Sequence, residues 1–234
     1  MKAVILAGGL GTRLRPYTLF VPKGMLPLGS KPVLEHIIGW LSNNGISDIV
    51  LCVGYLSKVI SDYFSDGSEL GVKISYVKAS RPMGTAGQLK SAQKLLHESF
   101  ICVYGDVILK NNLKKMIRYH MSKKAIATIG LTKYSERMKY GFIEIEKNGL
   151  VKSWSEKPEI SGLINAGVYV FEPSFLNAIP KGTIFGMDSA FESVIKENKK
   201  VFGYEIEGGF LDIGDRKTYL SADRKYIDEL ETIP

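Results

Sequence analysis

Apolar runs of five to seven residues alternate with segments of helical spacing through the first 131 positions. The runs lack a polar alternation, which is typical of strands that are buried on both faces of a parallel sheet. Their positions predict strands at 2–7, 48–53, 72–77, 100–104 and 125–131, and helices at 32–44, 56–64, 85–96 and 113–120. Short strands that alternate with helices of about 10 residues predict right-handed crossover units. We therefore expect an α/β fold with a doubly wound, mostly parallel, Rossmann-like sheet.

The pattern changes after residue 132. Segments 141–145 and 150–154 flank an Asn-Gly turn at Asn148 and Gly149, which is a strong hairpin signal. Further strands are predicted at 166–171 and 201–206, and further helices at 187–197 and 216–230. Since no repeat or linker interrupts the chain, we predict one domain over 1–234, with halves at 1–132 and 133–234. The second half is expected to form a smaller, partly antiparallel lobe.

Composition indicates a globular protein, with 45% apolar and 24% charged residues. No apolar run reaches the roughly 20 residues that span a bilayer. The opening apolar stretch is also shorter than the roughly 7–15 residues of a signal peptide core. Cys52 and Cys102 lie inside apolar runs without a second ligand at metal-binding spacing, which favours buried free thiols in a reducing compartment. We therefore expect a cytoplasmic protein with no membrane partner.

The formal net charge of +7 raises the question of nucleic-acid binding. The densest basic cluster is KKMIRYHMSKK at 114–124, which we interpret as a solvated helix face. No RNA-binding signature or zinc finger accompanies it, so we predict no nucleic-acid partner. A positive balance also suits small polyanionic substrates, through the field that it creates around a cleft.

The first strand leads into a loop that combines glycines with basic residues, Gly8-Gly9-Leu10-Gly11-Thr12-Arg13-Leu14-Arg15, and the loop ends at Pro22-Lys23. Clustered glycines let backbone N–H groups point at phosphate oxygens. A P-loop would need Gly-Lys-Ser/Thr, and a dinucleotide fingerprint would need a small residue at Leu14 and an immediate helix. The sequence therefore predicts a different phosphate cradle, although glycines alone are equally typical of a structural turn.

These residues carry a resemblance. The segment GGLGTRLRPYT…PKGMLPLGSKPVLEHII resembles the signature of the sugar-1-phosphate nucleotidyltransferases. Further motifs follow in family order, nearly to the end of the chain: Gly84-Thr85-Ala86-Gly87, Tyr104-Gly105-Asp106, Tyr140-Gly141, Glu156-Lys157-Pro158, Asn165-Ala166-Gly167-Val168-Tyr169 and Asp212-Ile213-Gly214. Each motif alone is weak, but the ordered set is specific.

The resemblance implies transfer of a nucleotidyl group from a nucleoside triphosphate to a hexose 1-phosphate, with release of pyrophosphate. Residues 1–132 would then be the nucleotide-binding half and 133–234 the sugar-binding and closing half. Arg13 would clamp the pyrophosphate and Lys23 would neutralise the α-phosphate and the attacking phosphate. The implied nucleotide-binding residues are Leu6, Ala7, Gly8, Gly9, Gly11, Thr12, Gly84 and Thr85; the sugar-binding residues are Gly141, Glu156, Lys157 and Asn165; and the Mg²⁺ ligands are Asp106 and Asp212.

A purely structural role is also open for several of these residues. Thr85 is also placed to cap a helix, and Glu156 with Lys157 would by default be an exposed charge pair. Of two carboxylates before the last helix, we assign Asp215 to the N-cap and Asp212 to the metal. We expect His36, His97 and His120 at the surface or its boundary, and Trp154 in the core.

Departures from the family pattern bear on the substrate. Gly24 follows Lys23 where the family usually has Pro or Glu, Ala79 stands where a Gln often faces a pyrimidine, and Leu211 replaces a common Trp. The sequence thus leaves a mannose-1-phosphate guanylyltransferase and a glucose-1-phosphate thymidylyl- or uridylyltransferase both open. It also leaves open a homo-oligomer and a non-catalytic paralogue that binds nucleotide sugars. We expect no appended β-helix domain.

Overall fold

A seven-stranded sheet forms the centre of the computed structural model, which describes residues 1–231. The strands, in chain order, are β1 (Ala3–Ala7), β4 (Asp48–Val53), β5 (Lys73–Lys78), β6 (Phe100–Tyr104), β8 (Ala127–Arg137), β11 (Glu159–Phe171) and β12 (Val201–Glu205). Their order across the sheet is β12-β8-β11-β6-β1-β4-β5. Only β11 runs against its neighbours, because its pairs with β6 and β8 are antiparallel while the other pairs are parallel. The mostly parallel sheet is thus confirmed.

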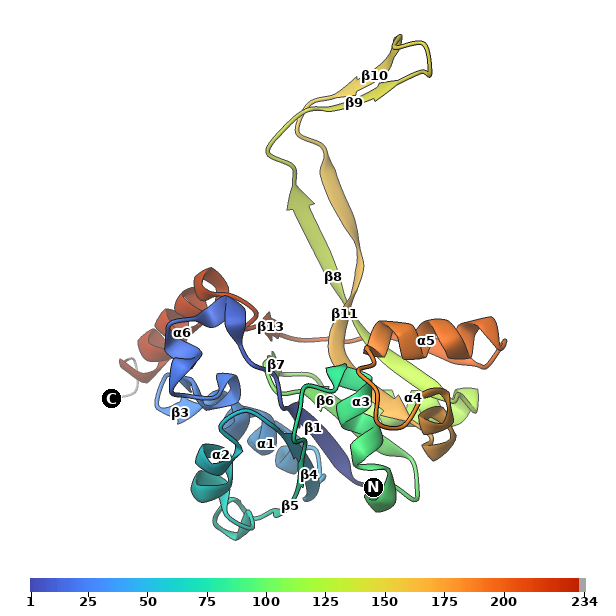
Figure 1. Ribbon diagram of the computed structural model, residues 1–234. Helices are drawn as coiled ribbons and strands as arrows, with labels where there is room; N and C mark the ends of the chain where they lie inside the picture. The colour runs from blue at the N-terminus through green and yellow to red at the C-terminus, as the bar shows by residue number, and fades with distance from the viewer. Residues whose placement is uncertain (232–234) are drawn as a thin grey trace.

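Helices cover both faces of this sheet (Figure 1). One face carries α1 (Val33–Asn43), α2 (Ser57–Phe64) and α4 (Leu113–Lys123), and the other carries α3 (Gly84–Ser91) and α5 (Met187–Lys196). The last helix, α6 (Arg216–Glu231), packs beside the loop that follows β1. Among the described residues, no helix combines the length and the apolarity needed to cross a bilayer.

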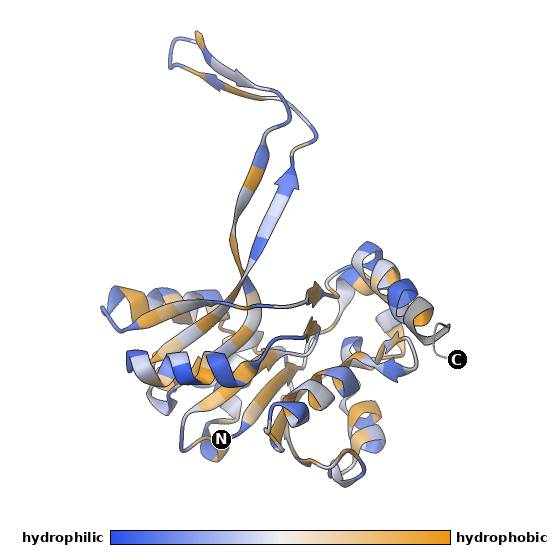
Figure 2. Ribbon diagram, turned by 180° about the vertical axis from the view of Figure 1, so that it is seen from behind, coloured by the Kyte–Doolittle hydropathy of each residue, from blue (hydrophilic) through white to orange (hydrophobic). Residues whose placement is uncertain are grey.

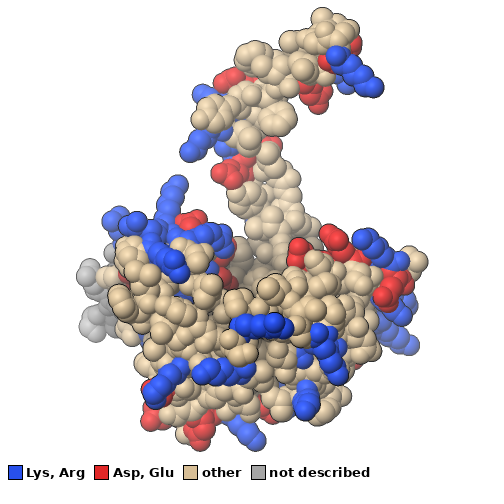
Figure 3. Space-filling view, in the orientation of Figure 1, with Lys and Arg blue, Asp and Glu red and all other residues tan. Residues whose placement is uncertain are grey.

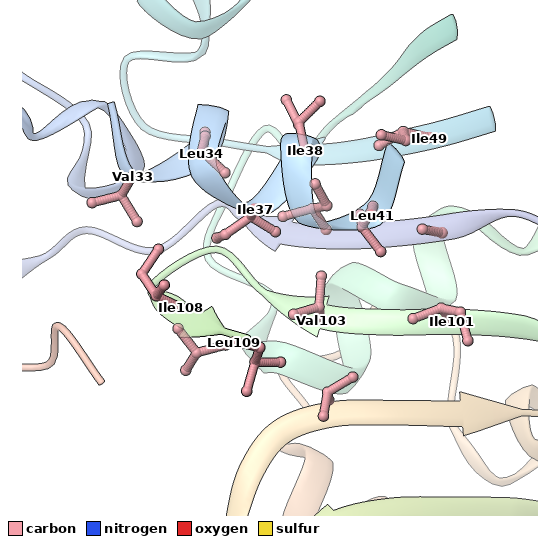
Figure 4. Packing of buried hydrophobic residues seen from close by; sticks show 14 of the residues in the cluster. Val33, Leu34, Ile37, Ile38, Leu41, Ile49, Ile101, Val103, Ile108 and Leu109 are labelled. Atoms are coloured by element: carbon pink, nitrogen blue, oxygen red, sulfur yellow. The ribbon is translucent and has the colours of Figure 1, made fainter. Parts of the chain in front are cut away.

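Two apolar layers follow from the alternation of side chains along each strand. On β1, Ile5 faces the layer under α1, while Val4 faces the layer that contains α3 and α5. Figure 4 shows Leu34, Ile38 and Leu41 of α1 in the first layer, and all three side chains are fully buried. Burying a side chain of this size stabilises the fold by roughly 1.5–3 kcal/mol. Figure 2 shows the same arrangement, with hydrophobic colour concentrated in the central strands and mixed colour on the helices.

Two small antiparallel ribbons flank the main sheet. The strands β2 (Pro27–Leu28) and β3 (Lys31–Pro32) form one ribbon, and β7 (Val107–Leu109) pairs with β13 (Phe210–Asp212) in the other. Single 3₁₀ turns occupy Thr12–Leu14, Tyr17–Leu19, Lys23–Met25, Ser68–Leu70 and Gln93–Leu95, and a longer 3₁₀ segment occupies Pro173–Ala178. Strands of two or three residues carry no readable period, so the sequence did not predict these ribbons.

Residues 132–164 form an arm that rises from the body of the molecule (Figure 1). Its lower part is the far end of β8 and the near end of β11, which pair without interruption from Glu159 opposite Arg137 to Asn165 opposite Leu131. Its tip is the predicted hairpin, formed by β9 (Phe142–Ile145) and β10 (Val151–Ser155). The sequence predicted the hairpin but not the length of β8 and β11, because the arm lacks a buried face.

Two expectations about burial are wrong. Trp154 is not in the core, since it lies on the arm and is 66% exposed. His120 is not at the surface, because it is fully buried between the Thr128 hydroxyl at 2.8 Å and the Glu172 carboxylate at 3.2 Å. A histidine with two polar partners tolerates burial, and the partners stand too far along the chain to be read from spacing.

Candidate active site

A cleft of about 350 Å³ opens at the carboxyl ends of β1 and β6. Ligands of parallel α/β sheets bind at this edge, because the loops that leave the strands converge there. The cleft is lined by Leu6, Gly9, Arg13, Thr85, Gln88, Tyr104, Asp106, Val107, Asn165, Gly167, Phe210 and Asp212. Residues from the opening loop, the second glycine motif and both predicted metal positions therefore share one cavity.

The glycine-rich loop is held in an open, looped conformation. The backbone N–H of Gly8 donates to Gln88 Oε1 at 2.9 Å, and the Thr18 hydroxyl donates to the carbonyl oxygen of Gly11 at 2.7 Å. Gly11 has a φ of 61°, and a Cβ there would lie 2.9 Å from the Thr18 methyl group. A larger residue would therefore break the turn that presents Thr12 and Arg13 to solvent.

Lys23, in the turn that begins after Pro22, contacts a residue that lines the cleft. Its ammonium contacts the Asp106 carboxylate, and both side chains are largely shielded from water, with 15% and 28% exposed. Gly24 fits where a Cβ would lie 2.6 Å from the Leu34 side chain. The unusual glycine therefore lets the turn pack closely against α1, with the Lys23 ammonium beside Asp106.

The second predicted metal position reaches the first through the β7–β13 ribbon. Asp212 lies opposite Val107 in this ribbon, and the N–H of Ile213 donates to the carbonyl oxygen of Asp106 at 2.9 Å. Desolvation by the cleft walls and the negative charge of Asp106 raise the pKa of Asp212. Lys23 and Arg13 act in the opposite direction. Two carboxylates and two cations thus share one electrostatic environment.

This carboxylate pair suits a divalent cation. Carboxylate oxygens are hard donors, and a bound cation would relieve both the burial of the Asp212 charge and its repulsion by Asp106, the two causes that raise the Asp212 pKa. Within residues 1–231, no cluster of three or more His, Cys, Asp or Glu side chains forms a complete metal cage. Two protein ligands leave coordination positions for phosphate oxygens, which is the usual arrangement for Mg²⁺ in phosphoryl-transfer sites.

The second glycine motif begins α3. Gly84 has a φ of 70°, and a Cβ there would overlap the carbonyl oxygen of Phe185. Thr85 does not cap its own helix as the alternative interpretation suggested, because its hydroxyl accepts a hydrogen bond from the Met187 N–H at 2.8 Å. Thr85 instead ties α3 to the start of α5. The N-cap assignment of Asp215 is confirmed, since the N–H of Thr218 donates to its carboxylate at 2.9 Å.

Asn165 belongs to a chain of polar side chains that the sequence did not reveal. Its amide donates to the Tyr169 hydroxyl at 2.6 Å, and that hydroxyl donates to the Tyr104 hydroxyl at 2.9 Å. Burial raises the pKa of Tyr104, and hydrogen bonds with Tyr169 and Thr85 partly oppose the shift. The side-chain oxygen of Asn165, Oδ1, also accepts a hydrogen bond from the backbone N–H of Gly167 at 3.0 Å. Tyr169 follows Asn165 by four positions within the same motif, but it was not among the predicted site residues.

Three predicted sugar-binding residues lie outside the cleft. Glu156 and Lys157 stand on the arm between β10 and β11, with 61% and 52% of their side chains exposed. Gly141 lies beside them, since a Cβ there would be 2.9 Å from Glu156 Oε2. The structure thus brings these three together with one another but not with Asp106 and Asp212.

Comparison with known proteins places the chain among nucleotidyl transferases. The model of the family described as nucleotidyl transferase matches residues 2–229. The mannose-1-phosphate guanylyltransferase catalytic subunit beta of Dictyostelium discoideum is 36% identical over 239 residues, which cover 99% of this chain and 66% of that protein. The mannose-1-phosphate guanyltransferase of Saccharomyces cerevisiae is 35% identical over 238 residues, covering 98% and 66%. The chain spans just under two thirds of the length of these relatives.

Solved structures show the same fold. A putative glucose-1-phosphate thymidylyltransferase from Bacillus anthracis superposes with a TM-score of 0.80 at 22% identity, covering 97% of this chain and 96% of that one. HddC from Yersinia pseudotuberculosis, solved in complex with GMP-PN, gives a TM-score of 0.76 at 27% identity, covering 96% and 99%. Both resemblances extend over nearly the whole chain.

Proposed function

Because the chain belongs to the nucleotidyl transferase family, we propose that it joins a nucleotidyl group from a nucleoside triphosphate to a sugar 1-phosphate. The observation that carries the proposal is the convergence of Arg13, Asp106 and Asp212 on one cleft at the carboxyl edge of the sheet, with the Lys23 ammonium in contact with Asp106. A site built from two cations and two carboxylates suits a reaction between two phosphate groups. We propose GTP and mannose 1-phosphate as the substrate pair, since the relatives described above carry that activity in their names.

In the proposed reaction, a phosphate oxygen of the sugar 1-phosphate attacks the α-phosphorus of the triphosphate. The new P–O bond forms as the bond to pyrophosphate breaks, so no proton must be removed from an already ionised nucleophile. The protein's task is to align two anions and to neutralise their charge. The Lys23 ammonium, which contacts Asp106 of the cleft, would neutralise charge where the two phosphates meet.

The remaining cleft residues bind and orient. The Arg13 guanidinium holds two phosphate oxygens in a fork geometry, which suits the leaving pyrophosphate. We assign triphosphate binding to the backbone N–H groups of Gly9, Gly11 and Thr12 in the glycine-rich loop, and to Gly84 and Thr85 at the start of α3. Asn165, whose amide is hydrogen-bonded to Tyr169, is the cleft residue that we assign to binding the sugar. Asp106 and Asp212 would hold Mg²⁺, which neutralises phosphate charge in reactions of this class.

Release of pyrophosphate tests the proposal directly. The purified chain is incubated with Mg²⁺, GTP and mannose 1-phosphate, and then with each other common nucleoside triphosphate against mannose and glucose 1-phosphates. We expect turnover with at least one pair, loss of turnover in EDTA, and the highest kcat/KM with the GTP and mannose 1-phosphate pair. Absence of pyrophosphate release across every pair would refute the transferase.

Replacement of Lys23 tests the mechanism. Lys23→Ala removes a charge that acts on the transition state, so kcat should fall by about 100-fold or more. Lys31→Ala is the matched control, because Lys31 is an exposed lysine that pairs with Glu35 away from the cleft. Equal kcat values for the Lys23 and Lys31 variants would rule out the assigned role of Lys23.

A further inference from the structure

The arm holds three predicted sugar-binding residues away from the cleft. Gly141, Glu156 and Lys157 meet one another on the arm, whereas the phosphate-binding residues lie in the body. The arm is not a loose loop, because β8 and β11 continue the hydrogen-bonded register of the central sheet as far as Arg137 and Glu159. Folding the arm down onto its own cleft would require this ladder to bend.

Apolar side chains occur on both faces of the arm's tip. Phe142 and Ile143 are 57% and 45% exposed, and neighbours in a strand point to opposite faces. Leu150 and Val151, at the start of the returning strand, are 62% and 57% exposed. Figure 3 shows the arm clear of the body, with most of its surface neither basic nor acidic. Closure onto the arm's own body would cover one face and leave the other in water.

An isolated two-stranded ribbon is marginally stable in water, so this arm needs a surface to pack against. Trp154 adds a large exposed ring, at 66%, close to Glu156, whose carboxylate accepts from its indole N–H at 3.3 Å. Lys157 holds a φ of 46°, a costly conformation for a residue with a side chain. An exposed aromatic ring and two charged side chains thus sit together on the arm.

We propose that the arm of one chain docks on the body of a second copy and completes the partner's cleft with Glu156 and Lys157. The inference rests on the proposed function, and it deepens it by making the sugar side of each active site come from the other subunit. A two-fold axis makes the exchange reciprocal. One face of each arm would then pack on the partner's body, and the other face would pack on the partner's arm. Two faces of exposed apolar residues are what such an exchange needs.

Exposed apolar side chains also occur on the body, in segments that neighbour cleft residues. Phe20, in the loop between Arg13 and Lys23, is 84% exposed, and Ile184, next to the Phe185 carbonyl that faces Gly84, is 72% exposed. Figure 3 also shows Lys and Arg side chains gathered over the lobe that contains α6 and the opening loop. An arm seated between these apolar residues would bring its charged bend over the phosphate-binding side of the cleft.

Complementation between two inactive variants tests the exchange. The first variant, Lys23→Ala with Asp106→Asn, has a defective cleft and an intact arm. The second, Glu156→Gln with Lys157→Ala, has an intact cleft and a defective arm. Each alone should be inactive, but heterodimers isolated through two different tags should regain one good site of two, which is about half of the wild-type kcat. No activity above the sum of the two variants would overturn the proposal and favour closure within one chain.

A second measurement separates this inference from the proposed function. We expect a dimer by light scattering, and a monomer for Ile143→Ser with Val151→Ser. Ile195→Ser is the matched control, because Ile195 is 56% exposed on α5, outside the arm, and should leave the dimer intact.

Fluorescence reports on the arm itself. In a Trp40→Phe background, Trp154 is the remaining tryptophan, and its emission should shift to longer wavelength when dilution separates the dimer. If the wild type shows no transferase activity, a dimer that depends on the arm still supports the exchange. A monomer, or a dimer that survives the arm substitutions, overturns the exchange even if the enzyme is active.

Discussion

Replacing Tyr169 with phenylalanine removes a single hydroxyl from the contact between the core and the cleft. This hydroxyl accepts a hydrogen bond from the Asn165 amide at 2.6 Å and donates one to Tyr104 at 2.9 Å, while the ring is fully buried against Phe171. The aromatic packing remains in the variant. The experiment therefore measures the hydrogen-bonded chain separately from the volume of the side chain.

The magnitude follows from the two lost bonds. Each contributes about 0.5–1.5 kcal/mol net, so their loss costs roughly 1–3 kcal/mol of the free energy of unfolding. Asn165 is exposed and recovers part of its bond from water, which places the expected loss at about 1–2 kcal/mol. For a chain of this length, that loss lowers the melting temperature by roughly 2–8 °C.

Urea unfolding gives the stability change, and steady-state kinetics give the functional change. In Tyr169→Phe the urea midpoint should fall with an unchanged m-value. A freely rotating Asn165 should raise KM for the sugar 1-phosphate by about 5-fold if about 1 kcal/mol of binding is lost, with little change in KM for the triphosphate. Tyr63→Phe is the control, because it removes a hydroxyl that bonds to Glu35 at an exposed position.

Two results would refute this reasoning. A loss in Tyr169→Phe no larger than in the Tyr63→Phe control would show that the buried hydroxyl contributes nothing to stability. Equal effects on KM for both substrates would show that Asn165 is not oriented by Tyr169 toward the sugar.

Three further predictions use other parts of the structure. Gly84→Ala should destabilise the protein by about 2 kcal/mol or more, because backbone strain at φ 70° adds to an overlap of the new Cβ with Phe185. The control Gly71→Ala, at φ 68° in open space, should lose only about 1 kcal/mol. Equal melting temperatures for the two variants would contradict the overlap. Phe175→Ala should cost about 3–5 kcal/mol in urea unfolding, since the ring is fully buried and stacks on Phe171 at 4.1 Å; a loss below about 1.5 kcal/mol would mean that the site collapses around the missing ring. The raised pKa of Asp212 means that the folded state binds the carboxyl proton more tightly than the unfolded state does. Stability is therefore lost as the pH rises from the pKa of Asp212 in the unfolded state toward its pKa in the folded state. Without metal, Asp212→Asn should therefore melt above wild type at pH 7, with the gap closing below about pH 4, and a gap that is constant with pH would contradict the shift.

The sequence predicted best those helices and strands whose pattern of apolar residues follows directly from burial in the core. The strands Asp48–Val53 and Phe100–Tyr104 match their predicted bounds, because they are buried on both faces and end at turn residues. Gly45 ends α1 with a φ of 84°, as its position after the apolar stripe indicated.

What the sequence did not predict is set by contacts between distant segments. The ribbon of β7 with β13 is three residues long on each side, and its partners come from segments that lie far apart in the sequence. The arm has no buried face, so its strands carry no alternation that separates them from a loop. Trp154 was assigned to the core because large aromatic residues are usually buried, yet its side chain is exposed on the arm.

For the site, motif residues were easier to predict than their supports. Arg13, Asp106, Asp212, Thr85 and Asn165 line the cleft as expected, although their roles stay predictions. Gln88, which fixes Gly8, and Tyr104, which ends the hydrogen-bonded chain from Asn165, went unpredicted because each acts through a partner distant in sequence. Spacing rules describe neighbours along a helix or strand, and they carry no signal for such pairs.

The β7–β13 ribbon also sets a time order on the ribosome. Asp106 emerges directly after β6, but Asp212 follows only after the chain has passed through β8, β11 and β12. A nascent chain that has reached β12 has every strand of the central sheet, while its cleft still holds one carboxylate of the two. The carboxylate pair is therefore completed only after every strand of the central sheet has been synthesised.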